Sequence, residues 1–176
     1  MQTSTPGTWS DAFLTTLKAN DVRLVSYVPD NVLAPLIAGA QCDDFFSSVV
    51  ATREDEALGL AAGAWMGGVR SIVMMQTSGF GVVPNALASL LVPYQIPVIL
   101  AVSERGTLGE FNIGQVLVMR TMRPTLDSIA VSYHTLTDAD TMPFVVDRAL
   151  KQAYATLNPV VFILSPLLTG GKVFKT

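Results

Sequence analysis

The stretch at residues 52–68 reads TREDEALGLAAGAWMGG, and the fold assignment starts from it. Its body is almost uncharged, and its alanine, leucine and tryptophan side chains are spaced to form a wide apolar helix face. Its acids fall only in the first turn, at Glu54, Asp55 and Glu56. The helix dipole stabilises negative charge there by about 0.3–1 kcal/mol. The stretch therefore predicts a strand end that leads into a capped, largely buried helix.

Strand and helix signals alternate about six times along the rest of the chain. Strands are expected over residues 22–28, 45–51, 71–75, 97–102, 129–133 and 160–164. Helices are expected over residues 10–18 (with Ser10 as N-cap), 32–38, 54 to the Gly67–Gly68 stop, 85–91, 116–123 and 144–156. The strands are continuous hydrophobic runs, which is typical of a parallel sheet covered on both faces. The prediction is a single doubly wound α/β domain over residues 1–176, with about six mainly parallel strands.

Composition excludes several classes of protein. Half of the 176 residues are hydrophobic and 14% are charged, which indicates that part of the surface is covered by a partner. A net charge of −3 argues against nucleic-acid binding. Cys42 is the sole cysteine, so an intrachain disulfide and a cysteine metal cluster are excluded. Without a membrane-length apolar run or a signal-like N-terminus, we expect a cytoplasmic protein.

Polar groups follow four of the expected strands, at the ends where doubly wound sheets bind ligands. They are Pro29-Asp30-Asn31, Thr52-Arg53-Glu54, Gln76-Thr77-Ser78-Gly79 and Ser103-Glu104-Arg105. The last of these opens a polar, glycine-punctuated segment, residues 103–115, which is typical of a functional loop. The residues alone leave Glu54 open as either a catalytic acid or an ordinary helix cap.

The order of these residues resembles a known family. Glu54-x-x-Ala57-x-x-x-Ala61-x-Gly63, followed after a strand by QTSGFG at residues 76–81, is similar to the pyrimidine-binding domain of thiamine-diphosphate enzymes. Within that family the chain looks like the alpha subunits of sulfopyruvate decarboxylase and their phosphonopyruvate decarboxylase relatives. The runs that carry this likeness are residues 75–90, 94–97, 103–106 and Gln115. Thr77, where close relatives would carry Asn, and the bulky Phe80 depart from the pattern.

The resemblance implies roles for particular residues. Glu54 would contact the cofactor's aminopyrimidine ring as the catalytic acid–base group. The cofactor would also be bound by Thr77, Ser78 and Gly79, whose glycine allows close backbone approach or positive φ.

Substrate binding is implied for Asn31, Arg53, Arg105 and Gln115, with the two arginines as partners for an anion. Each has a plainer alternative: Asn31 as a helix N-cap, Gln115 as a solvated amide and the arginines as surface charges. No metal ligand is expected in this chain. His134, placed just beyond a strand, is expected to be structural.

The sequence lacks the motif with which the family binds diphosphate, and this indicates a second subunit. The family fixes the cofactor's diphosphate through Mg²⁺ with a Gly-Asp-Gly motif and a following Asn on a second domain. This sequence contains no Gly-Asp-Gly, no P-loop and no GxGxxG. The resemblance therefore implies that thiamine diphosphate is shared with a beta subunit that holds the Mg²⁺, in a hetero-oligomer. The helices that begin near Glu54 and Asn85 are expected to present small and apolar residues to another chain.

The function implied is the alpha subunit of a two-subunit, thiamine-diphosphate-dependent 2-keto acid decarboxylase, a carboxy-lyase active only with its partner. The favoured reaction converts 3-sulfopyruvate to sulfoacetaldehyde and CO₂. The alternatives are a phosphonopyruvate decarboxylase, an acetolactate-type carboligase subunit, and a non-catalytic α/β partner or regulatory protein.

Overall fold

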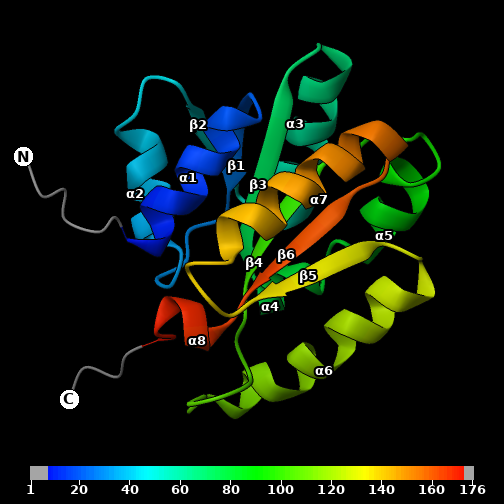
Figure 1. The fold of residues 1–176 in the computed structure, drawn as a ribbon. Coiled ribbons are helices and arrows are strands. Elements are labelled where there is room, and N and C mark those ends of the chain that lie inside the picture. The colour runs from blue at the N-terminus through cyan, green and yellow to red at the C-terminus, as the bar shows by residue number, and fades with distance from the viewer. Residues whose placement is uncertain (1–7, 173–176) are drawn as a thin grey trace, which may run out of the picture.

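One six-stranded sheet organises the computed structural model, which describes residues 8–172 (Figure 1). Its order is β2-β1-β3-β4-β6-β5, and every neighbouring pair is parallel. The strands are β1 (Val22–Tyr27), β2 (Ser47–Val50), β3 (Arg70–Gln76), β4 (Ile99–Ser103), β5 (Ser132–Leu136) and β6 (Val160–Leu164). The predicted parallel α/β fold is confirmed.

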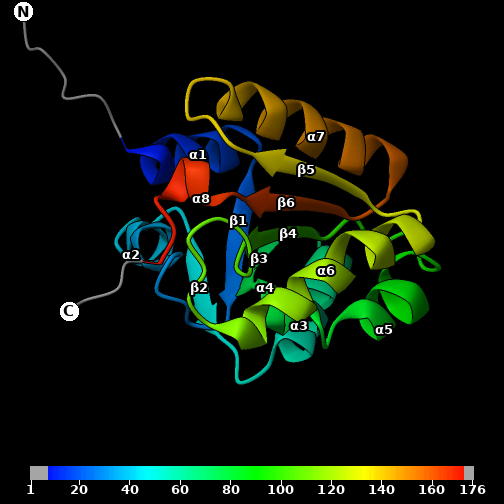
Figure 2. The same ribbon diagram turned by 90° about the horizontal axis from the view of Figure 1, so that it is seen from below.

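Helices cover both faces of this sheet, as Figure 2 shows with α1 and α7 above it and α3, α5 and α6 below it. The helices are α1 (Trp9–Ala19), α2 (Ala34–Gln41), α3 (Glu54–Met66), α4 (Thr77–Phe80), α5 (Pro84–Ala86), the π-helical turn η1 (Leu87–Leu91), α6 (Ile113–Ser128), α7 (Met142–Thr156) and α8 (Pro166–Thr169). None of the helices in the described part of the chain is both long enough and apolar enough to cross a membrane.

The central strands bury side chains on both faces, which explains their continuous hydrophobic runs. In β3, Ile72 and Met74 join the core under α1, α2 and α7, whereas Val73 and Met75 join the core under α3, η1 and α6. All four side chains are fully buried. Because successive strand residues point to opposite faces, each core takes every second residue of the run.

Several predicted boundaries are wrong, for local reasons. The N-cap of α1 is Thr8 rather than Ser10, because the Thr8 hydroxyl accepts from the Asp11 N–H and the Asp11 carboxylate accepts from the Thr8 N–H. The last predicted strand before α7 also shifts. Ala130 adopts a φ of 54° after α6, so β5 begins at Ser132 and His134 lies inside the strand rather than beyond it.

The helix after the predicted functional loop starts earlier than expected. The Asn112 side chain accepts a hydrogen bond from the Gly114 N–H at 3.0 Å, so α6 begins at Ile113 and shortens the loop. Residues 85–91 are helical as expected, but most of the stretch is the π-helical turn η1.

The topology creates one switch point at the carboxyl edge of the sheet. Neighbouring strands β1 and β3 send their connections to opposite faces: α2 packs Leu36 and Ile37 into the first core, and α4 packs Phe80 into the second. A crevice forms where the chain diverges in this way, and doubly wound sheets bind ligands there. The residues that follow β1 and β3 are therefore placed to meet a ligand.

Candidate active site

A cavity of about 530 Å³ opens at the switch point. It is lined by Pro29, Asp30 and Asn31 after β1, by Gln76 at the end of β3 and by Arg105 after β4, together with Tyr27, Ala34, Ile37, Ala38, Gln41 and Lys172. Three of the four predicted polar groups thus meet here. The fourth, Thr52-Arg53-Glu54, lies outside this lining.

Glu54 is the first residue of α3 and is half-buried against Gly79. A Cβ atom at Gly79 would overlap the Glu54 Oε1 and lie 2.5 Å from its Cδ, so the carboxyl occupies the space that a side chain would need. No hydrogen bond or ion pair within residues 8–172 engages that carboxyl.

The two neighbouring acids each make side-chain bonds at this helix start, whose N-cap residue Arg53 makes no capping bond with its own side chain. Asp55 pairs with Arg53 at 3.0 Å, and Glu56 accepts a hydrogen bond from the Thr52 N–H at 2.7 Å. Both interactions tie the first turn of α3 to the residues that precede it. Glu54 is therefore the acid of this turn that capping does not use.

The segment after β3 is helical, because Thr77 begins the short helix α4. Thr77 is fully buried; its hydroxyl donates to the Ser103 carbonyl at 3.0 Å and accepts from the Arg105 N–H at 3.0 Å. These two bonds join the end of β3 to the chain after β4. Gly79 has no positive φ, so it supplies close approach alone. The half-buried Ser78 hydroxyl makes no hydrogen bond with the described residues.

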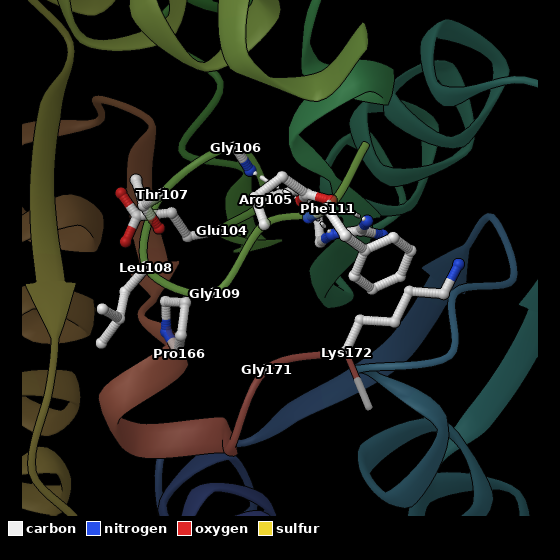
Figure 3. A pocket seen from close by; sticks show the side chains of 11 residues that line it. Glu104, Arg105, Gly106, Thr107, Leu108, Gly109, Phe111, Pro166, Gly171 and Lys172 are labelled. Carbon is white, nitrogen blue, oxygen red and sulfur yellow. Dashed lines mark hydrogen bonds and ion pairs between the residues drawn. The ribbon is translucent and has the colours of Figure 1, made fainter. Parts of the chain in front are cut away.

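Arg105 lies in the cavity wall but is not a free cation. It is 6% exposed, and its Nε and Nη2 each donate to Glu110 at 2.8 Å in a two-pronged ion pair. Figure 3 shows the loop around this pair. Its Nη1 edge makes no bond to a carboxylate of residues 8–172, while Glu110 neutralises the charge.

Glu110, which the sequence interpretation missed, organises that loop. Its carboxylate also accepts from the backbone N–H groups of Gly106, Phe111 and Asn112 at 2.9–3.1 Å. The pKa of Glu110 is lowered to about 2, mainly because Arg105 donates hydrogen bonds to its carboxylate. An acid five residues after an arginine in a glycine-punctuated loop was the available signal.

Three further predicted residues differ in their surroundings. Asn31 lines the cavity, and its alternative role as a cap is taken by Asp30, whose Oδ1 accepts from the N–H groups of Val32 and Leu33. Gln115, on the first turn of α6, has a buried Oε1 with no hydrogen-bond partner in the described chain. Arg53 is an exposed ion-pair partner of Asp55, away from the cavity.

The buried Arg105–Glu110 pair predicts acid sensitivity. The pKa of Glu110 in the folded chain, about 2, lies below its ordinary value of 4.5. Its stabilising contribution is therefore complete above about pH 4.5 and is lost as the pH falls toward 2. Glu110→Gln should lower the free energy of unfolding by about 1–3 kcal/mol at pH 7. The difference in free energy of unfolding between the wild type and Glu110→Gln should become smaller as the pH falls from 4.5 to 2. Urea unfolding at each pH measures it.

The exposed carboxyl of Glu56 provides the control. Glu56→Gln should shift the free energy of unfolding at pH 7 by less than about 1 kcal/mol. A gap between Glu110→Gln and the wild type that stays constant down to pH 2 would contradict the pairing seen here.

Comparison with known proteins gives the family. No family model matches the chain. It is 30% identical over 156 residues to sulfopyruvate decarboxylase subunit alpha of Methanocaldococcus jannaschii, covering 89% of this chain and 92% of that one. The same subunit of Methanothermobacter thermautotrophicus is 36% identical over 126 residues, which cover 72% of this chain and 76% of that one. Phosphonopyruvate decarboxylase of Streptomyces viridochromogenes is 40% identical over 89 residues, which are 51% of this chain and 22% of that enzyme.

A solved structure supports the fold. A 2-oxoglutarate:ferredoxin oxidoreductase from Magnetococcus marinus superposes with a TM-score of 0.70 at 14% identity, covering 93% of this chain and 29% of that one. At that identity the likeness concerns the fold alone. The sequence relatives span nearly the whole chain and carry the assignment: this chain belongs to the family of sulfopyruvate decarboxylase alpha subunits.

Proposed function

We propose that this chain is the pyrimidine-binding alpha subunit of a two-subunit, thiamine-diphosphate-dependent decarboxylase that acts on a 3-substituted pyruvate. The favoured substrate is 3-sulfopyruvate, with sulfoacetaldehyde and CO₂ as products. The observation that carries the proposal is the half-buried Glu54 carboxyl, which lies against Gly79 and is left unused by the capping of α3.

The residues at this edge fit the pyrimidine half of the cofactor. Gly79 lets the Glu54 carboxyl approach the backbone at this edge, since no Cβ occupies that space. The buried Oε1 of Gln115 is an acceptor that lacks a donor among the described residues, as expected of a group that meets a ligand. When bound, thiamine diphosphate supplies a nucleophilic carbon for the keto group and an electron sink for decarboxylation.

Glu54 has the acid–base role in this proposal. Its carboxyl would hold a proton at a pyrimidine ring nitrogen, and this favours the ring tautomer whose exocyclic amine can accept a proton. Fixation at a helix start suits that task because the backbone orients the side chain at no further cost in ordering. Asn31 and Gln115 would face the substrate and cofactor, and Ser78 would offer its hydroxyl. Thr77 would act indirectly, by holding the strand ends together.

The partner is proposed to be a beta subunit that carries the diphosphate-binding domain and Mg²⁺. The relatives are named alpha subunits, which implies a second subunit for them. Exposed apolar side chains on α3 and α6 could meet the partner: Leu60, Met66, Ile113 and Leu117. The stretch from Asn85 offers less than its sequence indicates, because Leu87 and Leu91 are fully buried. We also propose a cytoplasmic location.

A phosphonopyruvate substrate is the second candidate, favoured by the 40% identity to a phosphonopyruvate decarboxylase over 89 residues. Sulfonate and phosphonate are both tetrahedral oxyanions, so the same cavity chemistry would accept either. Assaying the assembled complex with both 3-substituted pyruvates, side by side, distinguishes the two.

Glu54→Gln is the sharpest test of mechanism. Glutamine keeps the size and the helix start but removes the acid, so the complex should assemble and retain cofactor. Turnover of 3-sulfopyruvate should fall by about 10²–10⁴-fold, the usual contribution of a positioned acid–base group. Steady-state release of CO₂ from the co-expressed two-subunit complex measures it.

Two neighbours serve as controls for that experiment. Asp55→Asn and Glu56→Gln each remove a charge from the same helix turn and should alter turnover by less than about threefold. Each should instead lower the free energy of unfolding by about 0.5–1 kcal/mol. Equal, small effects of all three substitutions on turnover would show that Glu54 is only an acid at the helix start, without a catalytic role.

Gly79→Ala tests the close approach without touching the acid. The new Cβ would overlap the Glu54 carboxyl and displace it, so turnover should fall at least about tenfold. Gly63→Ala, in α3, is the stability control because nothing in this chain lies within 4 Å of its Cβ position; the free energy of unfolding of the isolated chain should be unchanged or rise by about 0.5–1 kcal/mol. Full activity of Gly79→Ala would show that the close approach at Gly79 is not needed for turnover.

The isolated chain should not bind thiamine diphosphate tightly, because the residues for the charged half of the cofactor are absent from its sequence. Calorimetry should show dissociation above about 100 μM for the chain alone and micromolar or tighter binding for the complex. Micromolar binding by the chain alone would overturn the shared-site proposal.

A further inference from the structure

The cavity at the switch point lacks a fully free cation from the residues so far described. Arg105 is neutralised by Glu110, and Asp30 adds a carboxylate to the rim. Arg53, the other arginine predicted to bind an anion, pairs with Asp55 on the surface outside the cavity. A substrate that carries two acid groups would therefore meet little net positive charge from these side chains.

Lys172 supplies the missing charge from the far end of the described chain. It lines the same cavity as Asn31, Gln76 and Arg105. No carboxylate within residues 8–172 forms an ion pair with its ammonium. Sequence interpretation passed over it because it lies 67 residues after Arg105, beyond the last strand.

A built turn brings Lys172 to the cavity. After α8, Gly170 and Gly171 both adopt left-handed backbone, with φ of 78° and 66°, which glycine reaches without steric cost. The Gly171 N–H donates to the Thr169 hydroxyl at 3.2 Å, and a Cβ at Gly171 would lie 3.4 Å from Pro166. The chain is thereby reversed toward the loop that carries Arg105.

Arg105 and Lys172 both lie close to the ring of Phe111. The Arg105 Cζ lies 5.9 Å and the Lys172 Nζ 5.8 Å from the centroid of its ring. Figure 3 shows the lysine side chain running alongside that ring. Contacts of this kind favour an ammonium near the ring and so limit where the Lys172 side chain extends.

We propose that Lys172 binds the acid group at C3 of the substrate, the sulfonate or phosphonate, and so selects dianionic over monoanionic 2-keto acids. This inference rests on the proposed function. An ammonium presents three donors and a compact charge, which suits a tetrahedral oxyanion. The Nη1 edge of Arg105, which pairs with no group of residues 8–172, can complete the contact. The neutral pairing of Arg105 with Glu110 then leaves Lys172 as the charge that distinguishes the substrates.

Lys172→Gln in the assembled complex tests this assignment. The KM for 3-sulfopyruvate should rise by about 10–100-fold, the loss expected for a charge-assisted hydrogen bond, while kcat stays within about threefold. Lys172→Arg should restore KM to within about fivefold. Lys151→Gln is the control: Lys151 pairs with Asp147 on α7 at 2.8 Å, does not line the cavity and should leave KM unchanged.

A binding measurement separates this inference from the proposed reaction. The probe is 3-sulfopropanoate, an unreactive dianion, compared with propanoate by calorimetry on the same complexes. Wild-type affinity for the dianion should exceed that of Lys172→Gln by about 10–100-fold, and added salt should reduce the gap. Propanoate should bind both complexes equally.

Each outcome decides between the two claims. Lysine-dependent binding of the dianion without turnover of 3-sulfopyruvate would reject the reaction and keep the anion site. Turnover of 3-sulfopyruvate with KM and dianion affinity unchanged in Lys172→Gln would reject the anion site and keep the reaction. A wild-type complex that neither binds the dianion nor turns over the substrate would overturn both.

Discussion

The carboxyl edge of this sheet depends on one buried hydroxyl, that of Thr77. It donates to the Ser103 carbonyl and accepts from the Arg105 N–H, and so it ties the end of β3 to the chain that leaves β4. The Ser103 hydroxyl continues the link by donating to Asp30 after β1 at 3.0 Å. Three strand ends are thereby fixed relative to one another, and the cavity between them keeps its shape.

This network also explains how a small chain holds charged groups inside its edge. Arg105 is paired with Glu110, and the buried Glu104 is paired with Arg123 of α6 at 2.7 Å. Both pairs anchor the loop that follows β4, one within the loop and one to the helix after it. Buried charges are tolerated when their partners and hydrogen bonds are complete. The Glu54 carboxyl and the Gln115 Oε1, like the buried Thr107 hydroxyl, have no hydrogen-bond partner within the described chain, so they are open to a ligand.

The sequence predicted the fold well because its signals are local. Hydrophobic runs, glycine stops and the acids at the start of α3 each depend on neighbours within one turn or strand. What it missed depends on contacts between distant residues. The Thr77 hydroxyl was assigned to the cofactor, but its partners lie 26 and 28 residues away. Arg105 was taken as a free anion partner because the spacing of Arg105 and Glu110 does not by itself show that the loop between them folds to pair the two side chains. Lys172 reaches the cavity through two positive-φ glycines, which a sequence shows only as a turn.

The central claim is that this chain contributes one half of a shared active site, with Glu54 at the cofactor's pyrimidine ring. The most direct measurement is a crystal structure of the chain with its partner subunit, thiamine diphosphate and Mg²⁺. A Glu54 carboxyl oxygen should lie within about 2.6–3.2 Å of a pyrimidine ring nitrogen, a hydrogen-bond distance. A cofactor bound wholly within the partner, or with its pyrimidine ring out of reach of Glu54, would show that the two chains do not share the site in this way.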